Sequence, residues 1–499
     1  MRLTVKNSQL KFIYKVYFSN LLSNFALKGV TKTRVLLTLP PDIHKLEIYK
    51  VTGIKAPPLG LAWIAAVLEE KGHKVKIIDS PTLELGWSDW LREVKSWHPD
   101  VVGFSMLTPT APKGYKAAKM LKEEMGEDLP IIAGGVHVTP MYEEALNNHI
   151  DVVVLGEGEQ TTAELIEVVG RHGLNREKLR EVKGLAFKDG SRTVVTGVRP
   201  FIEDLDSLPW PARHLLPMDK YTLLNKPIRL AHAMASRGCP YGCTYCITSY
   251  FWGRRVRFRS AKSVADEVEH LVDKYKVGQI VFTDDDLTVN RRFVYELVKE
   301  LRSRGIDIPF SCGSRVDHVD KEYLEFLYKN GCNALYFGVE SASQETIDRI
   351  GKKIRLDQTV RVFRWVREVG GFAAGSFILG FPWETIEDMK RTVDFAIKLQ
   401  PNYAQFTVLT PYPGTPLYDY ALKYNLIEDW NWEHYTTVKP VMRGFHFTME
   451  KLGKMFTYAY RKFYLRKQFI LEEIKSGRFK KIFKPVIMGA LSWLKEKIL

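Results

Sequence analysis

Three of the five cysteines in this chain fall within eight residues, at Cys239, Cys243 and Cys246. Their spacing, C-x₃-C-x₂-C, puts three thiolates on one short loop with no fourth cysteine nearby. Such a loop can hold three irons of a [4Fe–4S] cluster and leave the fourth iron open, whereas clusters that only carry electrons usually have four cysteine ligands. The sequence therefore predicts a cluster whose open iron binds a chelating substrate or cofactor.

Two other uses of clustered cysteines fit this chain less well. A zinc knuckle needs four ligands and usually a C-x₂-C pair, and neither Cys312 nor Cys332 stands where it would complete one. Five cysteines in 499 residues do not make the disulfide framework of a secreted protein. Few, clustered cysteines are instead typical of a reducing, low-oxygen cytoplasm.

The cysteine loop resembles the signature of the radical S-adenosylmethionine (SAM) enzymes. In that family the amino and carboxylate groups of SAM chelate the open iron, and the reduced cluster cleaves SAM to a 5′-deoxyadenosyl radical. The resemblance implies this chemistry and an electron donor such as a ferredoxin or flavodoxin, whereas the spacing alone indicates only a site with three thiolates.

Strands and helices are expected to alternate after the loop. Together with a strand that leads into the loop, five later strands would form a partial (β/α)₆ barrel over residues 231–425. These five strands are expected at 279–286, 309–315, 334–341, 374–384 and 403–411, with helices at 261–276, 290–304, 320–330 and 384–400.

Polar side chains at the strand ends suit the groups that SAM presents. Glu340 is expected to bind the ribose hydroxyls and Arg315 the carboxylate, although a structural ion pair is the alternative for both. By resemblance to the family, Tyr245 lies near the adenine, and the motif Gly380-Phe-Pro-Trp-Glu384 shapes the adenine pocket.

No catalytic residue is identified from the sequence, but two candidates remain. Asp284 and Asp285 are placed to meet an ammonium or a substrate group, with helix capping by one of the acids as the alternative. Cys312 and Cys332 are expected to be ordinary buried thiols. Because Cys312 falls on a barrel strand, it stays a candidate hydrogen donor beside Asp285.

The first part of the chain also predicts an α/β fold, with a parallel, doubly wound sheet over residues 34–198. Ligands of such sheets lie beyond the carboxyl ends of the strands. The Gly-rich G-x-G-x-x-G fingerprint is absent after the first strand, where two prolines stand instead, so a nicotinamide cofactor is disfavoured. Strands are expected at 34–38, 74–79, 101–105, 131–137 and 152–159. One helix is expected over 57–72, and another is expected to follow the third strand and to end at residue 122.

This order of motifs resembles the Rossmann-like cobalamin-binding domain that precedes many radical SAM enzymes, and the likeness covers about residues 34–170. An empty flavodoxin-like scaffold is the alternative. The matching motifs are Pro57-Pro58-x-Gly60, Ser105-x-Leu107-Thr108, Gly134-Gly135-x-His137 and Gly156-Glu157-Gly158-Glu159. The resemblance implies cobalamin contacts from Pro58, Ser105, Leu107, Thr108, Gly134, Gly135, His137, Gly156, Glu157 and Glu159.

A histidine ligand for cobalt is not expected. Related cobalamin domains carry it in Asp-x-His-x-x-Gly, but here Asp42-Ile43-His44 is followed by Glu47 where the glycine should stand. We therefore expect His44 to be a loop residue and His137 to be part of the pocket wall.

Positive charge is concentrated in the two tails. Of the net charge of +15, residues 1–33 carry +6 and residues 451–499 carry +10, so the rest is close to neutral. A nucleic-acid enzyme would carry this charge around its active site, and no nucleic-acid partner is expected. The tails combine lysines with Phe, Trp and Leu, as interfacial membrane helices do, although packing on the protein is the alternative.

The expected domain order is a basic amphipathic segment at 1–33, the cobalamin domain at 34–198, a proline-rich linker at 199–230, the barrel at 231–425 and a basic helical extension at 426–499. The expected location is cytoplasmic and peripheral at a membrane. The expected function is radical activation of an unreactive C–H bond in a membrane lipid or other hydrophobic substrate, for ring formation, other C–C bond formation or methylation. Similar families are the archaeal tetraether-lipid ring synthases, the hopanoid methylases and the magnesium-porphyrin ring cyclases. Two alternatives are a cobalamin-dependent C-methyltransferase of a soluble small molecule or peptide, and a sensor without catalysis.

Overall fold

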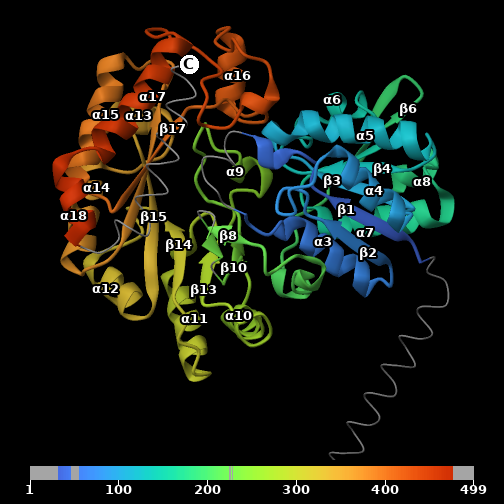
Figure 1. Ribbon diagram of the computed structural model, residues 1–499, viewed down its shortest axis with the longest axis horizontal. Coiled ribbons are helices and arrows are strands. Elements are labelled where there is room, and N and C mark those ends of the chain that lie inside the picture. Colours follow the sequence, from blue (N-terminus) through green and yellow to red (C-terminus); the bar gives the residue numbers. More distant parts are fainter. Residues whose placement is uncertain (1–31, 47–54, 224–225, 228, 476–499) are drawn as a thin grey trace, which may run out of the picture.

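Two α/β bodies lie side by side in the computed structural model, which describes residues 32–46, 55–223, 226–227 and 229–475 (Figure 1). The first body is built on a seven-stranded sheet of order β2-β1-β3-β4-β5-β6-β7. The first five strands in this order are parallel, and the last two pairings are antiparallel. The strands are β1 (Arg34–Thr38), β2 (Lys74–Ile78), β3 (Val101–Ser105), β4 (Ile131–Gly134), β5 (Val152–Val154), β6 (Leu185–Asp189) and β7 (Arg192–Val195).

Helices cover both faces of this sheet, which confirms the doubly wound prediction. Because the central strands β1, β3, β4 and β5 are buried on both faces, they are nearly continuous apolar runs. One face packs against α3 (Leu59–Glu70), α7 (Gly158–His172) and α8 (Arg176–Glu181), and the other against α4 (Trp87–Trp97), α5 (Ala111–Met125) and α6 (Tyr142–Leu146).

The order 2-1-3-4-5 is that of the flavodoxin-like sheets, which bind ligands where the strand order reverses, between β1 and β3. The sequence did not predict β6 and β7, which extend the sheet as an antiparallel hairpin beyond β5. The predicted fifth strand, 152–159, is also too long, because Gly158 already begins α7.

The second body is a six-stranded parallel sheet of order β10-β13-β14-β15-β16-β17, which confirms the partial barrel. Alternate strand residues pack outward against the helices in one large apolar core. The strands are β10 (Leu230–Ala233), β13 (Gln279–Phe282), β14 (Phe310–Ser314), β15 (Cys332–Glu340), β16 (Ala373–Leu379) and β17 (Tyr403–Val408).

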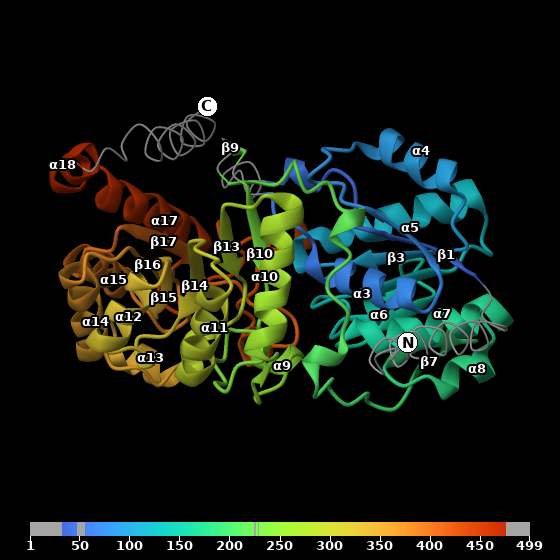
Figure 2. The same cartoon turned by 90° about the horizontal axis from the view of Figure 1, so that it is seen from below.

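The four predicted barrel helices appear as α10 (Ala261–Tyr275), α11 (Arg291–Ser303), α12 (Lys321–Lys329) and α15 (Ile386–Leu399). Two helices between β15 and β16 were not predicted, α13 (Gln344–Arg349) and α14 (Leu356–Glu368). Figure 2 shows these helices around the outside of the barrel, with α10 nearest the first body.

The chain between the two bodies contains two short 3₁₀ turns, η3 (Leu205–Ser207) and η4 (Arg213–Leu215). Arg213 is buried and forms an ion pair with Glu267 of α10, which fixes this segment on the barrel. An antiparallel pair of two-residue strands follows, β8 (Thr222–Leu223) and β9 (Lys226–Pro227).

After the barrel, α16 (Pro416–Lys423) is followed by the short turn η6 (Trp432–His434), which contacts η2 (Thr108–Thr110) and α5 of the first body. The helix α17 (Met449–Tyr464) then packs against α15 and β17 and buries Leu452, Met455 and Phe463. Part of the basic tail predicted to contact a membrane is therefore a packed helix of the barrel. The chain continues into α18 (Lys467–Lys475), and among the described residues no helix is long and apolar enough to cross a bilayer. Residues 1–31 and 476–499, on which the rest of the tail prediction depends, lie outside the described residues.

Candidate active site at the boundary of the two bodies

The cysteine loop follows the short strand β11 (Ser236–Arg237) and ends at α9 (Thr248–Phe251), beside the first body (Figure 1). Its backbone is held at both ends, because Cys239 N–H donates to the Gly253 carbonyl (3.4 Å) and Thr244 N–H donates to the Ile350 carbonyl (2.9 Å). Gly238 has φ +99°, and a Cβ there would lie 2.4 Å from the Arg255 carbonyl, so only glycine fits at this turn.

The three thiols share one environment. Cys243 is buried and Cys239 and Cys246 are half-buried, and each of the other two thiols raises the pKa of Cys239. Burial is the larger cause and raises the pKa of Cys239 to about 11, so the thiolate needs a nearby positive charge. Among the described residues no group of Cys, His, Asp or Glu is close enough together to hold a single metal ion.

Asp284, at the end of β13, fixes the strand that leads into the loop. Its buried carboxylate accepts hydrogen bonds from Ala235 N–H (3.1 Å) and Ser236 Oγ (2.5 Å). Burial raises the pKa of Asp284 to about 6. The next residue, Asp285, is exposed and accepts a hydrogen bond from Thr248 Oγ1 (3.0 Å). Asp284 thus has a structural role, whereas Asp285 stays available at the strand end.

The third acid, Asp286, caps the 3₁₀ turn η5 (Leu287–Val289), as the capping alternative expected. Its second oxygen lies 2.7 Å from Nδ1 of His318, whose Nε2 lies 2.6 Å from the hydroxyl of Tyr241 in the cysteine loop. These contacts hold the outer part of the loop against the barrel.

Glu340 lies where β15 ends, in a left-handed backbone conformation with φ +67°. Its carboxylate forms a buried ion pair with Lys352, and burial together with the Glu340 charge raises the pKa of the Tyr245 hydroxyl well above its ordinary value. Gly338 leaves the space for this pair, because a Cβ there would lie 2.4 Å from both Glu340 Oε1 and Lys352 Nζ. The structure thus brings Glu340 and Tyr245 together beside the cysteine loop, and their roles with SAM stay predictions.

Arg315 is also next to the loop, and its guanidinium lies 3.4 Å from the ring centre of Tyr241. Its Nε and Nη2 donate to the two carboxylate oxygens of Asp317, both at 2.9 Å. The structural ion pair considered for Arg315 is therefore present, and its pairing with the SAM carboxylate stays a prediction.

Glu384 is buried inside the turn that it ends. It accepts hydrogen bonds from the N–H groups of Gly380 (3.2 Å) and Phe381 (3.1 Å) and from Ser341 Oγ (3.2 Å). Burial raises the pKa of Glu384 to about 7. The carboxyl group therefore shapes the turn from within, and Phe381 of the same turn packs against Tyr245.

Cys312 does not face the site. It is buried in the outer core beneath the barrel helices, beside Cys332, and its charge would be felt by Tyr323 of α12. Its role as a hydrogen donor stays a prediction, which this position among the apolar side chains of the outer core does not support. Cys332 is likewise a buried thiol, as expected.

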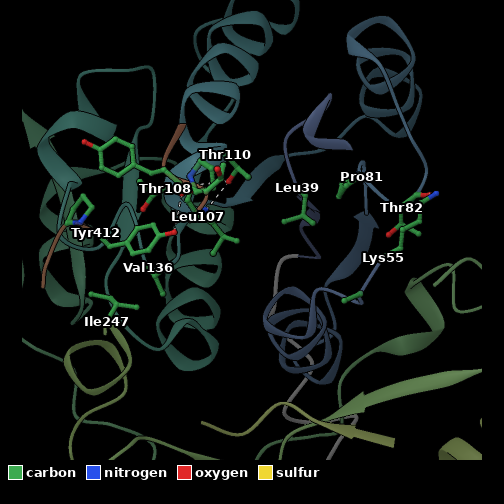
Figure 3. Close-up of a pocket in the computed structure, with 15 residues that line it drawn as sticks. Leu39, Lys55, Pro81, Thr82, Leu107, Thr108, Thr110, Val136, Ile247 and Tyr412 are labelled. Atoms are coloured by element: carbon green, nitrogen blue, oxygen red, sulfur yellow. Dashed lines mark hydrogen bonds between the residues drawn. The ribbon is translucent and has the colours of Figure 1, made fainter. Parts of the chain in front are cut away.

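A cavity of about 470 Å³ lies between the two bodies, at the carboxyl edge of the first sheet (Figure 3). Figure 3 shows Leu107, Val136 and Ile247 on one side and Leu39, Pro81 and Lys55 on the other. On the side of the first body, the wall is formed by residues that come after the ends of β1, β2, β3 and β4 in the sequence. On the side of the cysteine loop, the wall includes Ile247, which comes directly after Cys246. The lining residues are Leu39, Lys55, Ala56, Pro81, Thr82, Leu107, Thr108, Pro109, Thr110, Val136, Ile247, Tyr412, Pro413, Tyr435 and Thr436.

Of the predicted cobalamin contacts, Leu107 and Thr108 line this cavity. Gly135 stands behind it with φ +114°, and a Cβ there would lie 2.8 Å from the Met106 carbonyl. His137 is fully buried, with Nε2 3.5 Å from Glu144, while its neighbour Val136 lines the cavity. Within the described parts of the chain, Pro58, Ser105, Gly134 and Gly156 are not among the lining residues, although the first three each lie two residues from one in the sequence.

Glu157 and Glu159 differ most from expectation, because they bind the second body. Glu157 pairs with Arg237 (3.1 Å) and Arg257 (2.8 Å), and Glu159 pairs with Arg237 (2.5 Å). These side chains are at most 5% exposed, and Arg237 lies between the rings of Trp63 and Trp252. Since Arg237 is two residues before Cys239, these acids fasten the first body to the cysteine loop.

Several wall residues were missed from the sequence. Tyr412 and Pro413 belong to the segment Pro411-Tyr-Pro-Gly-Thr415, which follows β17. Tyr435 and Thr436 follow η6, and the Tyr412 hydroxyl donates to the Tyr435 carbonyl (3.1 Å). His44 lies on the 3₁₀ turn η1 (Ile43–Lys45) and does not line the cavity, in agreement with a loop residue.

The residues present fit both implied cofactors. Three thiols on one loop fit a [4Fe–4S] cluster with an open iron. An apolar cavity at the point where strand order reverses fits a corrinoid. A barrel with this cysteine loop, joined to a flavodoxin-like domain at the same cavity, defines a class of iron–sulfur enzymes with a second, corrinoid cofactor.

Comparisons with known proteins agree with that class. Residues 234–396 match the model of the Radical SAM superfamily, and residues 48–166 match that of the B12 binding domain. The chain is 38% identical to an uncharacterized methyltransferase of Pyrococcus horikoshii, across 88% of this chain and 94% of the relative. It is 31% identical to the anaerobic magnesium-protoporphyrin IX monomethyl ester cyclase of Cereibacter sphaeroides (82% and 67% covered) and 27% identical to the hopanoid C-3 methylase of Methylococcus capsulatus (74% and 69% covered).

The fold is similar to that of the solved radical SAM methyltransferase TsrM of Kitasatospora setae, with a TM-score of 0.62 at 20% identity over 77% of this chain and 74% of that one. The chain belongs to the cobalamin-dependent radical SAM enzymes. Its cofactors are a [4Fe–4S] cluster, SAM and cobalamin.

Proposed function

We propose that this enzyme forms a C–C bond at an unreactive C–H position of a hydrophobic substrate, a membrane lipid in the first place, by methylation or ring closure. The supporting observation is that the cavity assigned to the corrinoid meets the cysteine loop at Ile247, so a substrate held at this boundary would lie beside both cofactors. When bound, the cluster with SAM supplies a 5′-deoxyadenosyl radical, and the corrinoid supplies a methyl group or an electron.

The proposed task of the chain's own residues is to bind and orient. Cys239, Cys243 and Cys246 hold the cluster, and Glu340 and Tyr245 sit together where a ribose or adenine would approach the open iron. On the cavity side, Ile247 and the leucines, prolines and tyrosines exclude water, which protects a radical from side reactions.

Asp285 adds a polar group at the edge of this apolar region. Its exposed carboxylate lies after the end of β13 and accepts a hydrogen bond from Thr248. We propose that it binds a hydroxyl or ammonium group of the substrate and so orients the hydrocarbon part toward the cluster.

The range of the family supports this reading. One relative is a hopanoid C-3 methylase, and another is a magnesium-protoporphyrin IX monomethyl ester cyclase. Methyl transfer and ring closure thus both occur among proteins similar to this chain. The basic, apolar sequences at 1–33 and 476–499 support a peripheral membrane location, where a lipid substrate would be available.

A product analysis tests the proposal. The reconstituted enzyme is incubated without oxygen with a reductant, host lipid extract and SAM that carries a deuterated methyl group. Formation of 5′-deoxyadenosine together with a lipid that has gained the labelled methyl, or has lost hydrogen by ring closure, supports the proposal. Formation of 5′-deoxyadenosine only with water-soluble extract would contradict the lipid assignment.

A soluble small molecule or peptide, methylated by the same cofactors, is the second candidate. The helix α17 favours it, because this part of the basic tail buries its apolar face on the barrel and needs no membrane partner. Flotation with anionic liposomes separates the candidates: equal flotation of the full chain and of a variant without 1–31 and 476–499 favours the soluble substrate.

A further inference from the structure

Two short segments cradle the cysteine loop from outside. Residues 253–255 contact its first end, where the Gly253 carbonyl accepts from Cys239 N–H. Residues 350–353 contact its second end, where the Ile350 carbonyl accepts from Thr244 N–H, and a Cβ on Gly351 would lie 3.3 Å from the Gly242 carbonyl. Both segments are therefore in direct contact with the backbone that carries the thiols.

The outward side chains of these segments are cationic. Arg254, Arg255, Arg349 and Lys353 are exposed, and we call them the basic face. The guanidinium of Arg254 comes within 2.8 Å of a Cβ placed on Gly242, in the middle of the cysteine loop. The sequence from Arg349 to Arg355 contains no acid, and neither does the sequence from Arg254 to Arg259.

The charge of the basic face is largely uncompensated. Arg255 pairs with the exposed Glu203 (3.0 Å), and Arg349 lies 3.9 Å from the ring centre of Trp383. In the part of the chain that the structure describes, no carboxylate lies within ion-pair distance of Arg254, Arg349 or Lys353. Between the tails, residues 34–450 carry almost no net charge, so this concentration of cations next to the loop is local.

The position of the face indicates its use. An iron–sulfur cluster must receive an electron from outside, and electron tunnelling slows steeply with distance, so a donor has to approach the loop closely. Toward the interior, the loop is covered by the buried Glu340 and Lys352, and toward the first body by Glu157 and Arg237. In Figure 2 the helices that precede the two segments, α9 and α13, both lie along the lower rim of the barrel, at its surface.

We propose that the basic face is the docking surface for an acidic one-electron donor protein, which reduces the cluster through the loop from Cys239 to Cys246. Complementary charge raises the rate of such encounters by about 10- to 1,000-fold and makes it sensitive to salt. The proposal depends on the cluster and is independent of the substrate class.

Stopped-flow reduction of the holoenzyme tests the face. The double variant Arg254→Glu/Lys353→Glu is mixed without oxygen with a reduced flavodoxin of net negative charge, and the cluster absorbance is followed. The second-order rate constant is expected to fall at least about tenfold at low ionic strength, and the difference is expected to shrink as salt is added. The matched control, Lys299→Glu/Lys329→Glu, reverses two exposed charges on α11 and α12 and should reduce at the native rate.

Reduced methyl viologen, a small cation that needs no docking surface, serves as the second reductant. Unchanged reduction by viologen in the double variant, with slow reduction by flavodoxin, supports the proposal. A flavodoxin rate equal to that of the native enzyme overturns it, and so does an equal loss with both reductants, because the cluster itself is then altered. Loss of binding to anionic vesicles with an unchanged flavodoxin rate would assign the face to a membrane.

Discussion

Substitution of Glu157 by glutamine should loosen the joint between the cobalamin domain and the cysteine loop. Glu157 accepts hydrogen bonds from Arg237, Arg257 and Ile202 N–H (2.7 Å), and both guanidiniums are 3% exposed. Its carboxylate therefore compensates two buried cations at once. Although burial lowers the pKa of Arg237, Glu159 and Glu157 together raise it above its ordinary value, so the Arg237 guanidinium stays charged.

The expected cost follows from this geometry. Removal of one partner of a buried ion pair typically costs about 3–5 kcal/mol, because the other charge stays buried without compensation. Since Glu159 still faces Arg237 in the variant, the lower end applies, and we expect about 3 kcal/mol. For Glu164→Gln on α7, the helix that follows Glu157, we expect about 1 kcal/mol at most, because its pair with Arg199 lies near the surface.

Urea denaturation of the apoprotein measures this difference. With a slope of about 1–3 kcal/mol per molar urea, a loss of about 3 kcal/mol lowers the midpoint of the transition that separates the two bodies by about 1 M or more. The quadruple variant Glu157→Leu/Glu159→Leu/Arg237→Met/Arg257→Leu removes all four charges of the network and should recover most of the midpoint. If Glu157→Gln shifts the midpoint no more than Glu164→Gln does, the ion pairs do not join the two bodies.

Three further substitutions separate the roles assigned to single residues. Burial raises the pKa of Glu384 from 4.5 to about 7, so its protonated form is favoured in the fold. The stability that this group contributes is present below about pH 4.5 and is lost as the pH rises through about 7, by roughly 3 kcal/mol. In Glu384→Gln the unfolding midpoint should therefore depend less on pH between those values. An unchanged dependence of the midpoint on pH would contradict this assignment. Asp284→Ala leaves Ala235 N–H without its acceptor, at a cost of about 1–3 kcal/mol, and should lower the iron content per chain. The control Asp284→Asn should keep most of the iron. Full iron loading of the alanine variant would refute the structural role of Asp284 beside the cysteine loop. Gly135→Ala forces a Cβ against the Met106 carbonyl at φ +114°, at a cost of about 1–3 kcal/mol, and the variant should lose cobalamin but keep iron. If the absorbance shows that cobalamin is retained, Gly135 does not belong to the cobalamin site.

The sequence predicts the architecture well because the signals for it are local. Apolar runs such as those of β1, β3 and β5, separated by amphipathic helices, define a parallel sheet from short-range periodicity alone. The three-thiol loop is equally local, since all its ligands fall within eight residues.

The joint between the two bodies is not predictable in this way. The local sequence around an acid at a strand end does not differ between an acid that binds a ligand and one that binds another domain. In addition, the arginines that bind Glu157 come 80 and 100 residues later in the chain. The cavity wall formed by Tyr435 and Thr436 has no periodic signal at all, since tertiary packing of the chain after the barrel brings it there. For the same reason the sequence could not show that β14 turns Cys312 toward the helices.

We expect the cluster and the corrinoid to occupy neighbouring sites, joined through Ile247 directly after Cys246. Electron paramagnetic resonance of the anaerobic holoenzyme, prepared with a reduced cluster and paramagnetic cobalt, tests it most directly. We expect a magnetic interaction that speeds the relaxation of both centres, and loss of both the cluster signal and the interaction in Cys246→Ala, with cobalamin retained. Two centres that relax independently, or a cluster signal that persists in Cys246→Ala, would contradict the account.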